Sequence, residues 1–348
     1  MIRICYNQPL IACEGEKTDM LNSAKFKKAA GLIKKSENIL VTTHTKPDGD
    51  ACGCMAAMCY AIKTLRKKVT PVLPTELPDW YAFLFDKKPA VFGRDITAER
   101  LTGIDLIVLV DVNSYSQLPE IEKFLKQNQK PVLVIDHHRT TDGLGDVELV
   151  DVTAAAGGLI VLDFLKYAKW PITTKIAQAL FVAIAADTGW FQFSNTDSRV
   201  YRSCAELIDA GAKPTRIYHT LYHNFSPQRF KLMAAMLSTL NLHFDNRYAE
   251  MHLLQRGFAQ TGASYRDTEN FIDECRRIST VEAAALFVEL QDGRIKCSMR
   301  STGRVDVRRI AEKFGGGGHK MAAGTHLPPP LETARQTIKT EIEKQLGK

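Results

Sequence analysis

Three short apolar segments, each running into polar or acidic residues, constrain the fold of this chain more than any other feature. They are NILVTTH at 38–44, DLIVLVD at 105–111 and PVLVIDHH at 131–138. Helical patterns occur between and after them, at 51–67 and at 175–189. Apolar strands that alternate with helices are typical of a parallel sheet whose two faces are both covered. We therefore predict an α/β fold for this part of the chain, with helices on both faces of a parallel sheet.

The pattern changes towards the C-terminus. Segments at 248–255, 283–292 and 294–302 alternate apolar and polar residues, and Asp292-Gly293 is a strong hairpin signal. These features predict a smaller mixed α/β domain that is built on a mixed or antiparallel sheet.

Domain boundaries follow from these patterns. A first helix is expected at 22–35, with Ser23 as its N-cap, and residues before it are left unassigned. We predict a first domain at 22–210, a helical connector at 211–244 and a second domain at 245–348.

Composition narrows the class of protein. The 348 residues include 46 Lys and Arg against 39 Asp and Glu, a net charge of +7. This mild excess suits a small anionic substrate and is too weak to indicate wrapping of a long duplex. Eight cysteines occur without a C-x-x-C pair, and Cys52, Cys54 and Cys59 are expected to be buried on a helix. Free thiols, and the lack of a signal-like or membrane-spanning apolar run, predict a soluble, cytoplasmic protein with no membrane partner.

Polar side chains gather where the apolar elements end. In open α/β sheets, sites form beyond the carboxyl ends of the strands, so the groups that follow the three strands should converge. Taken alone, each acidic residue could be a helix cap or a turn former. Together, each at the end of an element, they are hard to explain as turns. The candidates are His44, Asp48, Asp50, Asp111, Asp136, His137, His138 and Asp187.

The residue types indicate the chemistry. Carboxylate and imidazole ligands without thiols favour manganese or magnesium over structural zinc. Four aspartates, at 48, 50, 111 and 187, would repel one another strongly unless cations lay between them. Two divalent ions about 3.5–4 Å apart would cancel that charge, hold a hydroxide and bind a phosphoryl oxygen. The sequence therefore predicts a two-metal site.

At this point the chain resembles a known family. H-x-x-x-D-x-D from His44, a strand-terminal Asp, the D-H-H triplet at 136–138 and a helix-terminal Asp form the ordered motif set of the DHH phosphoesterase superfamily. Residues 315–324 (GGGGHKMAAG) resemble the hallmark of its associated C-terminal domain. The resemblance covers roughly residues 25–345 and is greatest to the two-domain oligoribonuclease and 3′-phosphoadenosine-5′-phosphate phosphatase group (NrnA-type). It implies an active site in the cleft between the two domains.

The resemblance also implies a division of the ligands. His44, Asp48 and Asp111 would hold one manganese ion; Asp50, Asp111, His137 and Asp187 would hold the other, with Asp111 bridging. His138 would face the phosphate and Asp136 would orient a histidine as an outer carboxylate. The residues themselves indicate the same pool of ligands but do not assign ions or a bridge, and magnesium or another divalent ion stays an alternative to manganese.

The glycine run is the second candidate site. Gly316, Gly317 and Gly318 expose backbone N–H groups, and a short helix is expected at 319–324, so glycines and a helix N-terminus together would cradle a phosphate. Family resemblance adds His319 to this substrate-binding loop. Two further candidates at the end of a predicted strand, which would clamp a second anionic group, are Arg300 and Ser301. A surface salt bridge is the competing interpretation for the arginine.

We therefore predict a manganese-dependent phosphoesterase that hydrolyses very short oligonucleotides to mononucleotides, removes the 3′-phosphate of pAp, or does both, with a metal-bound hydroxide as the nucleophile. Its partner would be a short single-stranded oligonucleotide or a small nucleotide. A phosphodiesterase for linear or cyclic dinucleotides, or an exopolyphosphatase or pyrophosphatase, is the alternative. An inactive nucleic-acid-binding module is disfavoured because no ligand is lost. The choice of RNA or DNA, the direction of attack and the oligomeric state, with a homodimer as one option, stay open.

Overall fold

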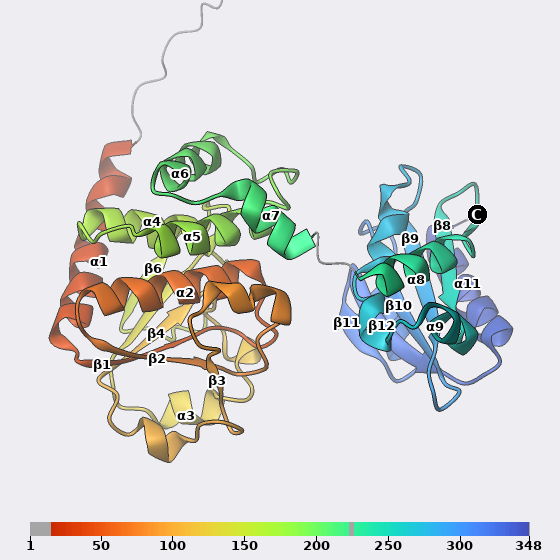
Figure 1. Ribbon diagram of the computed structural model, residues 1–348, viewed down its shortest axis with the longest axis horizontal. Helices are drawn as coiled ribbons and strands as arrows, with labels where there is room; N and C mark the ends of the chain where they lie inside the picture. Colours follow the sequence, from red (N-terminus) through yellow and green to blue (C-terminus); the bar gives the residue numbers. More distant parts are fainter. Residues whose placement is uncertain (1–14, 223–225, 348) are drawn as a thin grey trace, which may run out of the picture. The chain divides into compact units, whose positions relative to one another are not determined.

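The structure, a computed structural model, describes residues 15–222 and 226–347, with side chains from Ser23 onwards (Figure 1). Contacts divide the chain into two compact units, residues 1–223 and residues 224–348. Residues assigned above to a connector, 211–244, lie partly in each unit. Within the described ranges, none of the helices has the length and apolar character of a membrane-spanning segment.

The first unit is built on a parallel sheet, as predicted. Six strands pair in the order β3-β2-β1-β4-β5-β6 within residues 15–222. All five residues of β4 and of β5 are buried, because helices or loops cover both faces of the sheet. The strands are β1 (Asn38–Thr42), β2 (Lys68–Leu73), β3 (Ala90–Val91), β4 (Leu106–Val110), β5 (Val132–Asp136) and β6 (Val147–Val150).

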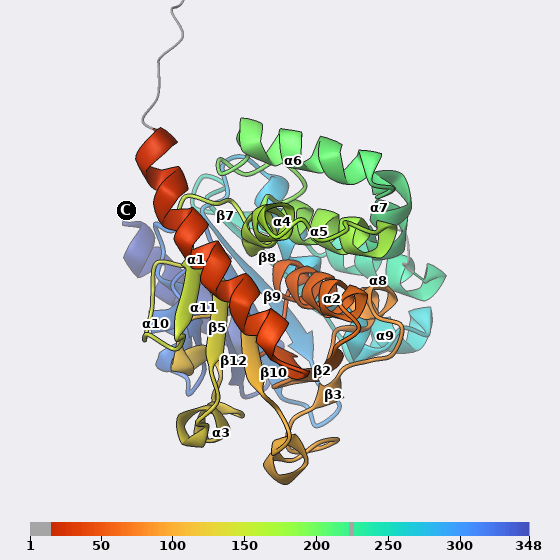
Figure 2. The same cartoon turned by 90° about the vertical axis from the view of Figure 1, so that its left-hand side faces the viewer.

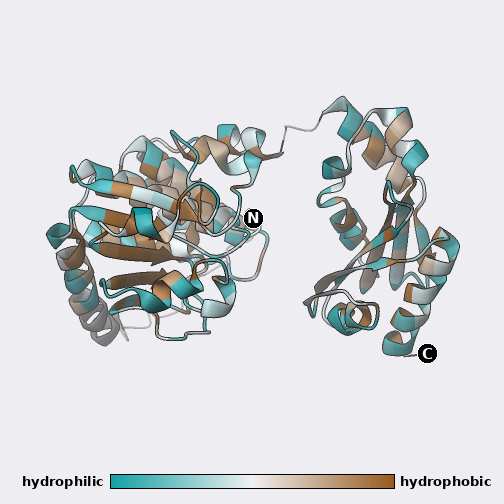
Figure 3. Cartoon of the chain, turned by 90° about the horizontal axis from the view of Figure 1, so that it is seen from below, coloured by the Kyte–Doolittle hydropathy of each residue, from teal (hydrophilic) through white to brown (hydrophobic). Residues whose placement is uncertain are grey.

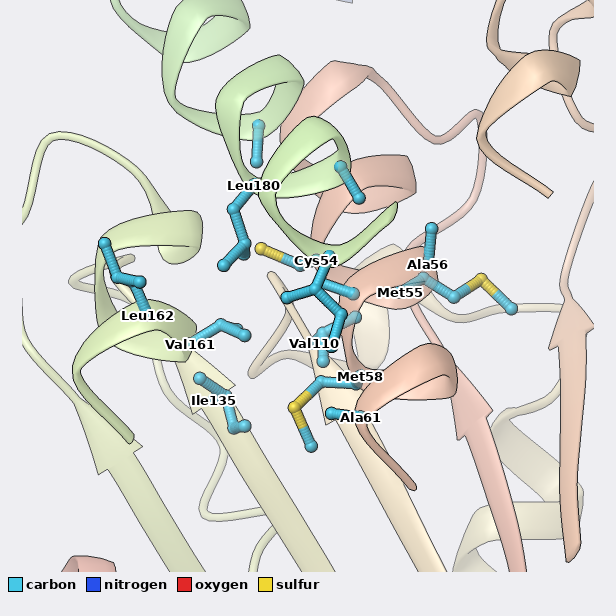
Figure 4. Packing of buried hydrophobic residues seen from close by; sticks show 14 of the residues in the cluster. Cys54, Met55, Ala56, Met58, Ala61, Val110, Ile135, Val161, Leu162 and Leu180 are labelled. Carbon is cyan, nitrogen blue, oxygen red and sulfur yellow. The ribbon is translucent and has the colours of Figure 1, made fainter. Parts of the chain in front are cut away.

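The larger helices cover one face of this sheet. The helices α2, α4 and α5 share a hydrophobic core with Val110 of β4 and Ile135 of β5, in which Met58 and Leu180 are buried (Figure 4). The helix α1 lies beside α4 and along β6 (Figure 2). Outward-facing helix surfaces are mostly hydrophilic, whereas the strands are mostly hydrophobic (Figure 3). The helices here are α1 (Gly15–Lys35), α2 (Gly49–Thr64), α4 (Gly157–Tyr167), α5 (Thr174–Asp187), α6 (Ser198–Asp209) and α7 (Pro214–Tyr222).

Short helices and turns cover the opposite face. Leu40, Ile107 and Val134 point into this second core, which includes the short helix α3 (Glu122–Gln127). The remaining elements of the unit are the 3-10 turns η1 (Asp79–Leu84), η2 (Ala98–Leu101) and η3 (Tyr115–Gln117).

Two local features differ from, or extend, the sequence analysis. The helix α1 begins at Gly15, so the predicted start at 22 and the Ser23 N-cap are wrong. Residues 15–22 contain good helix formers such as glutamate, lysine, methionine and leucine, which extend the helix although they carry no apolar stripe. The unassigned residues 1–14 lie outside the described part of the chain. The cysteines of α2, at 52, 54 and 59, are buried and free, as expected.

The helices α2 and α5 approach each other closely because α2 carries glycine where they meet. An ideal Cβ at Gly53 would lie 2.4 Å from the Ala179 carbonyl oxygen, and one at Gly49 would lie 2.4 Å from the Ala186 Cβ. The N-terminus of α2 therefore lies beside the C-terminus of α5.

The second unit has a mixed sheet. Within residues 226–347 the strand order is β11-β12-β10-β9-β8-β7, and only β8 and β9 pair in parallel. One face packs against α10 and α11, and the other against α8 and η5. The strands are β7 (Asn241–His243), β8 (Tyr248–Leu253), β9 (Ala283–Glu289), β10 (Ile295–Ser301), β11 (Gly317–His319) and β12 (Ala322–Leu327). The helical elements are α8 (Pro227–Leu237), α9 (Gln255–Thr261), η4 (Tyr265–Thr268), η5 (Phe271–Arg277), α10 (Val307–Glu312) and α11 (Leu331–Leu346).

The glycine run is a β-hairpin, so the helix expected at 319–324 is wrong. His319 pairs with Ala322 across a tight turn, and Gly317 pairs with Gly324. Pairing of β12 with β10 over six residue pairs favours the strand over the helix. The phosphate cradle cannot therefore include a helix N-terminus at this position.

Candidate metal centre

The ends of five elements bring the predicted metal ligands together. His44 follows β1, Asp111 follows β4 directly, and Asp187 is the last residue of α5. The D-H-H triplet begins on the last residue of β5. Asp48 is the N-cap of α2 and accepts hydrogen bonds from the amides of Asp50 and Ala51. Ligand atoms lie within 4.8 Å of one another in each of three groups, which are His44, Asp48 and Asp111; Asp50, His137 and Asp187; and Asp111, His137 and His138.

Asp111 is the residue shared by the two sides of this cluster. Its carboxylate is 2 % exposed; Oδ2 lies 3.5 Å from His44 Nε2, and Oδ1 lies 3.4 Å from His137 Nε2. Its backbone has φ = 56°, the left-handed region, and its amide donates to the Ile135 carbonyl at 2.8 Å. If the backbone of Asp111 continued the strand, its side chain would point into a core. The left-handed conformation instead directs the carboxylate to the end of the sheet.

Both histidines present the same ring nitrogen to the carboxylates. The Nδ1 atom of His137 lies 3.1 Å from the Ala154 carbonyl oxygen, and that of His44 lies 2.8 Å from the Thr45 carbonyl oxygen. Each Nδ1 therefore donates to a carbonyl and turns Nε2 towards the cluster, where it faces the carboxylates and where an ion would bind it. His137 Nε2 lies 3.1 Å from Asp187 Oδ2 and 3.7 Å from Asp50 Oδ2.

Asp50 is fully buried and is held by the first turn of α4. Its oxygens accept hydrogen bonds from the amides of Gly157 at 2.5 Å and Gly158 at 3.0 Å, and Cys54 Sγ lies 3.2 Å from Oδ1. The amides at a helix N-terminus favour an anion, which keeps a carboxylate in place without water.

The electrostatics favour a bound cation. Burial, together with the charges of Asp111 and Asp187, raises the pKa of Asp50 well above its usual range. Burial alone would lower the pKa of His44, but the hydrogen bond and charge of Asp111 outweigh it and raise that pKa to about 9. The pKa of His137 is raised to about 11, again against burial, by Asp111 and Asp187. Protons on these histidines compensate the clustered carboxylates, and divalent ions would displace them.

His138 and Asp136 form a pair beside the cluster. His138 Nδ1 lies 2.7 Å from Asp136 Oδ1, and the imidazole is 41 % exposed, whereas Asp136 is fully buried. The hydrogen bond that His138 Nδ1 donates to Asp136 raises the pKa of His138. Asp136 therefore contacts His138, not His137, and leaves the Nε2 edge of His138 towards solvent.

The C-terminal candidates lie together on one sheet of the second unit. His319, Ala322 and Arg300 face one another on three neighbouring strands, so their side chains share a face. Arg300 Nε lies 3.4 Å from Asp273 Oδ1, the ion pair that was the competing interpretation for this residue. Ser301 points to the other face, is 5 % exposed, and its Oγ accepts from the Gly303 amide.

The glycines of the hairpin differ in their surroundings. A Cβ at Gly316 would lie 2.2 Å from the Gly324 carbonyl oxygen, and one at Gly318, where φ is 141°, would lie 2.5 Å from the Ala322 carbonyl oxygen. A Cβ at Gly317 would meet no atom within 4 Å among the described residues. Gly316 and Gly318 are therefore needed for the close strand packing of the hairpin, whereas the space beside Gly317 is open.

Sequence reasoning missed two parts of this region. One is the Gly157-Gly158 turn that holds Asp50. The other is the aromatic segment Trp190, Phe191 and Phe193 that follows Asp187. A run of three aromatic residues in four positions directly after a candidate ligand was the signal that could have found it.

Comparisons with known proteins show the family of the chain. Residues 38–184 match the model of the DHH family, N-terminal domain, and residues 249–347 match that of the DHHA1 domain. The chain is 30% identical over 326 residues to the bifunctional oligoribonuclease and PAP phosphatase NrnA of Thermus thermophilus, which covers 92% of this chain and 94% of that protein. It is 26% identical over 328 residues to the cyclic-di-AMP phosphodiesterase PdeA of Listeria monocytogenes, over 90% of this chain and 47% of that protein.

A solved structure shares the fold. The crystal structure of an exopolyphosphatase-related protein from Bacteroides fragilis superposes with a TM-score of 0.80 and covers 92% of this chain and 96% of its own. The two sequences are 22% identical, so this likeness concerns the fold alone.

Proposed function

Since the chain belongs to the DHH family of phosphoesterases, we propose that it hydrolyses very short oligonucleotides to mononucleotides and removes the 3′-phosphate of pAp, with two divalent ions, best manganese. The relative from Thermus thermophilus carries both activities in its name, and the match spans almost the full length of both chains.

One observation carries the proposal. The Oδ1 atom of Asp111 and the Nε2 atom of His137 are buried and have no hydrogen-bond partner in the described chain. Buried polar atoms without a partner are rare and costly, so such a pair, 3.4 Å apart, fits a site in which both atoms would bind a metal ion. The donors are oxygen and imidazole nitrogen only, which fits manganese or magnesium.

The ligand sets would divide at Asp111. His44 and Asp48 would join it on one side, and Asp50, His137 and Asp187 on the other. Bound there, the two ions would supply an activated water and neutralise the charge that develops on the phosphoryl group.

The chain's own residues would orient the substrate and move a proton. Asp136 holds Nδ1 of His138, which fixes the ring and leaves Nε2 free to donate to a phosphoryl oxygen or to the leaving oxygen. The hydrogen bond to Asp136 raises the pKa of His138, which favours the protonated ring.

The second unit would bind the remainder of the substrate. Arg300 and His319 lie on one face about 10 Å apart, two strand spacings, with the small side chain of Ala322 between them. Gly317, on the edge strand β11, leaves room for close approach. We propose that Arg300 and His319 bind phosphate or base, that Gly316 and Gly318 shape the hairpin, and that Ser301 supports the loop after β10.

Rival specificities are a cyclic dinucleotide, as in the named activity of the relative from Listeria monocytogenes, and inorganic polyphosphate or pyrophosphate. The test is a substrate panel with added manganese: pAp, dinucleotides, five-mers, cyclic di-AMP and pyrophosphate. We expect the highest kcat/KM on dinucleotides and pAp. Preference for cyclic di-AMP or for pyrophosphate would replace the proposal with that rival.

A further inference from the structure

An aromatic loop follows Asp187 at the end of α5. In this loop, residues 188–193, Trp190 and Phe191 turn inward and pack edge-on against Phe181, at 6.3 and 6.0 Å between ring centroids. Phe193 differs, because it is 57 % exposed. Of the three aromatic residues, two anchor the loop in the core and the third is left on the surface.

The loop holds Phe193 in a defined position. The amides of Gln192 and Phe193 both donate to the Thr188 carbonyl at 3.0 Å, and Thr188 Oγ1 donates back to Ile184 of α5 at 2.7 Å. Gly189, Trp190 and Phe191 have positive φ angles of 56°, 54° and 68°. Such a left-handed run is unfavourable for L-residues and persists only where the surroundings hold it. The exposed ring is thus fixed by the loop.

Asn195, which closely follows this loop, contacts the backbone of the metal centre. Asn195 Nδ2 donates to the Asp187 carbonyl at 3.1 Å and to the Ala155 carbonyl at 3.2 Å. Ala155 follows Ala154, whose carbonyl fixes the ring of His137. The far end of the Phe193 ring rests on Gly189, where a Cβ would lie 2.5 Å from ring atoms. The Phe193 ring therefore packs on Gly189, which is two positions after the candidate ligand Asp187.

We propose that Phe193 is a specificity residue on which a nucleobase of the substrate stacks while its phosphate lies at the metal centre. This inference rests on the proposed function. A phenyl ring fixed on the surface loses little freedom on binding and gains from burial against a planar partner. Every base has a π-face, so stacking there would select nucleotides over inorganic phosphates without selecting a base.

The test uses three substrates and three variants. The substrates are a dinucleotide and its two analogues in which one base is replaced by hydrogen. The variants are Phe193→Ala, Phe193→Tyr, and Phe230→Ala as a control, since Phe230 is a phenylalanine of the other unit with 60 % exposure. We expect Phe193→Ala to raise KM for the dinucleotide about tenfold, as stacking of one base predicts, with kcat nearly unchanged. Phe193→Tyr and Phe230→Ala should stay close to wild type.

The analogues show whether the base is the partner. In the wild type, removing the stacked base should cost the same factor, and Phe193→Ala should add no further loss on that analogue. Equal losses on all three substrates, or none on the dinucleotide, would overturn the inference. So would a shift from dimer to monomer in Phe193→Ala, because the ring would then be a subunit contact. Failure of the proposed function is distinguishable, because the wild type would then hydrolyse none of the three.

Discussion

Asp111 combines three features that aspartate seldom shows together: a left-handed backbone, nearly complete burial and an oxygen without a hydrogen-bond partner in the described chain. Asparagine has the same shape and tolerates a positive φ, but it lacks the charge. We expect Asp111→Asn to reduce kcat/KM by at least about a hundredfold, since even outer contacts to a metal ligand are worth 10–100-fold. The variant should melt no lower than wild type when both are chelated. More than about a tenth of the wild-type activity would contradict a bridging role.

His44 and His137 give the site a pH dependence with opposite signs for stability and for metal binding. Their pKa values, about 9 and about 11, exceed that of an unfolded histidine, so the folded protein binds more protons. The stability that these protons contribute is complete below about pH 6.5 and is lost as the pH rises, through about 9 for His44 and about 11 for His137. Metal affinity should increase over the same range, because the ions displace these protons. Melting temperatures in EDTA and in manganese should therefore diverge between about pH 6 and about pH 9. A chelated protein whose melting temperature increases over this range would contradict the assignment.

At the scale of elements, the spacing of α2 and α5 sets the position of two ligands. Asp50 lies in the first turn of α2 and Asp187 in the last turn of α5. We expect Gly53→Ala, whose Cβ would meet the Ala179 carbonyl at 2.4 Å, to destabilise the protein by about 1–3 kcal/mol and to weaken manganese binding. Gly31→Ala is the matched control, because its Cβ in α1 would meet no described atom within 4 Å; it should be neutral or stabilising. Thermal melts and a metal titration measure both effects. If Gly53→Ala were destabilised but bound manganese as tightly as wild type, the spacing of α2 and α5 would not set the positions of the ligands.

The hairpin of β11 and β12 offers a second contrast. A methyl group at Gly317 enters open space, whereas one at Gly318 meets a backbone carbonyl at 2.5 Å. We expect Gly317→Ala to fold normally but to lose kcat/KM on a dinucleotide, because it narrows the approach to the strand. Gly318→Ala should lower the melting temperature. His319→Ala, which removes a donor, should cost about ten- to a hundredfold on the dinucleotide. For each of Gly317→Ala and His319→Ala, kcat/KM should also be measured on p-nitrophenyl phosphate. A loss on this substrate as large as the loss on the dinucleotide would argue against substrate binding by the hairpin.

The sequence predicts an element well when local patterns determine it, and poorly when pairing with distant residues does. The parallel sheet and the convergence of Asp111 with His44 and His137 follow from local patterns, because apolar strands of one direction end at one edge. The hairpin could not be predicted in this way. Met321, Ala322 and Ala323 favour helix by themselves, and only their pairing with β10 makes them strand. The loop after Asp187 was missed because its aromatic residues look like ordinary core until their exposure is known.

For the whole molecule, the candidate ligands all belong to the first unit and the hairpin belongs to the second. Chelation should therefore abolish activity, and manganese should restore it best. Metal at about a hundredfold over its Kd should stabilise the first unit by about 2.7 kcal/mol. In hydrogen exchange of the full chain, manganese should slow exchange in α2, β4 and α5 and leave β10 and β12 unchanged. Full activity in excess EDTA would contradict a metal-dependent reaction. Equal slowing of hydrogen exchange in both units would contradict the placement of all metal ligands in the first unit.

The division between the two units also has a consequence during synthesis. Every candidate ligand lies between residues 44 and 187, in the unit that leaves the ribosome first. At typical rates of protein synthesis, the remaining 125 residues, 224–348, take on the order of ten seconds to translate. In that interval the proposed metal ligands would already be folded together, while the hairpin that would bind a nucleotide does not yet exist. Loading with metal would then precede the capacity to bind substrate, so no bound nucleotide would cover the site when the ions arrive.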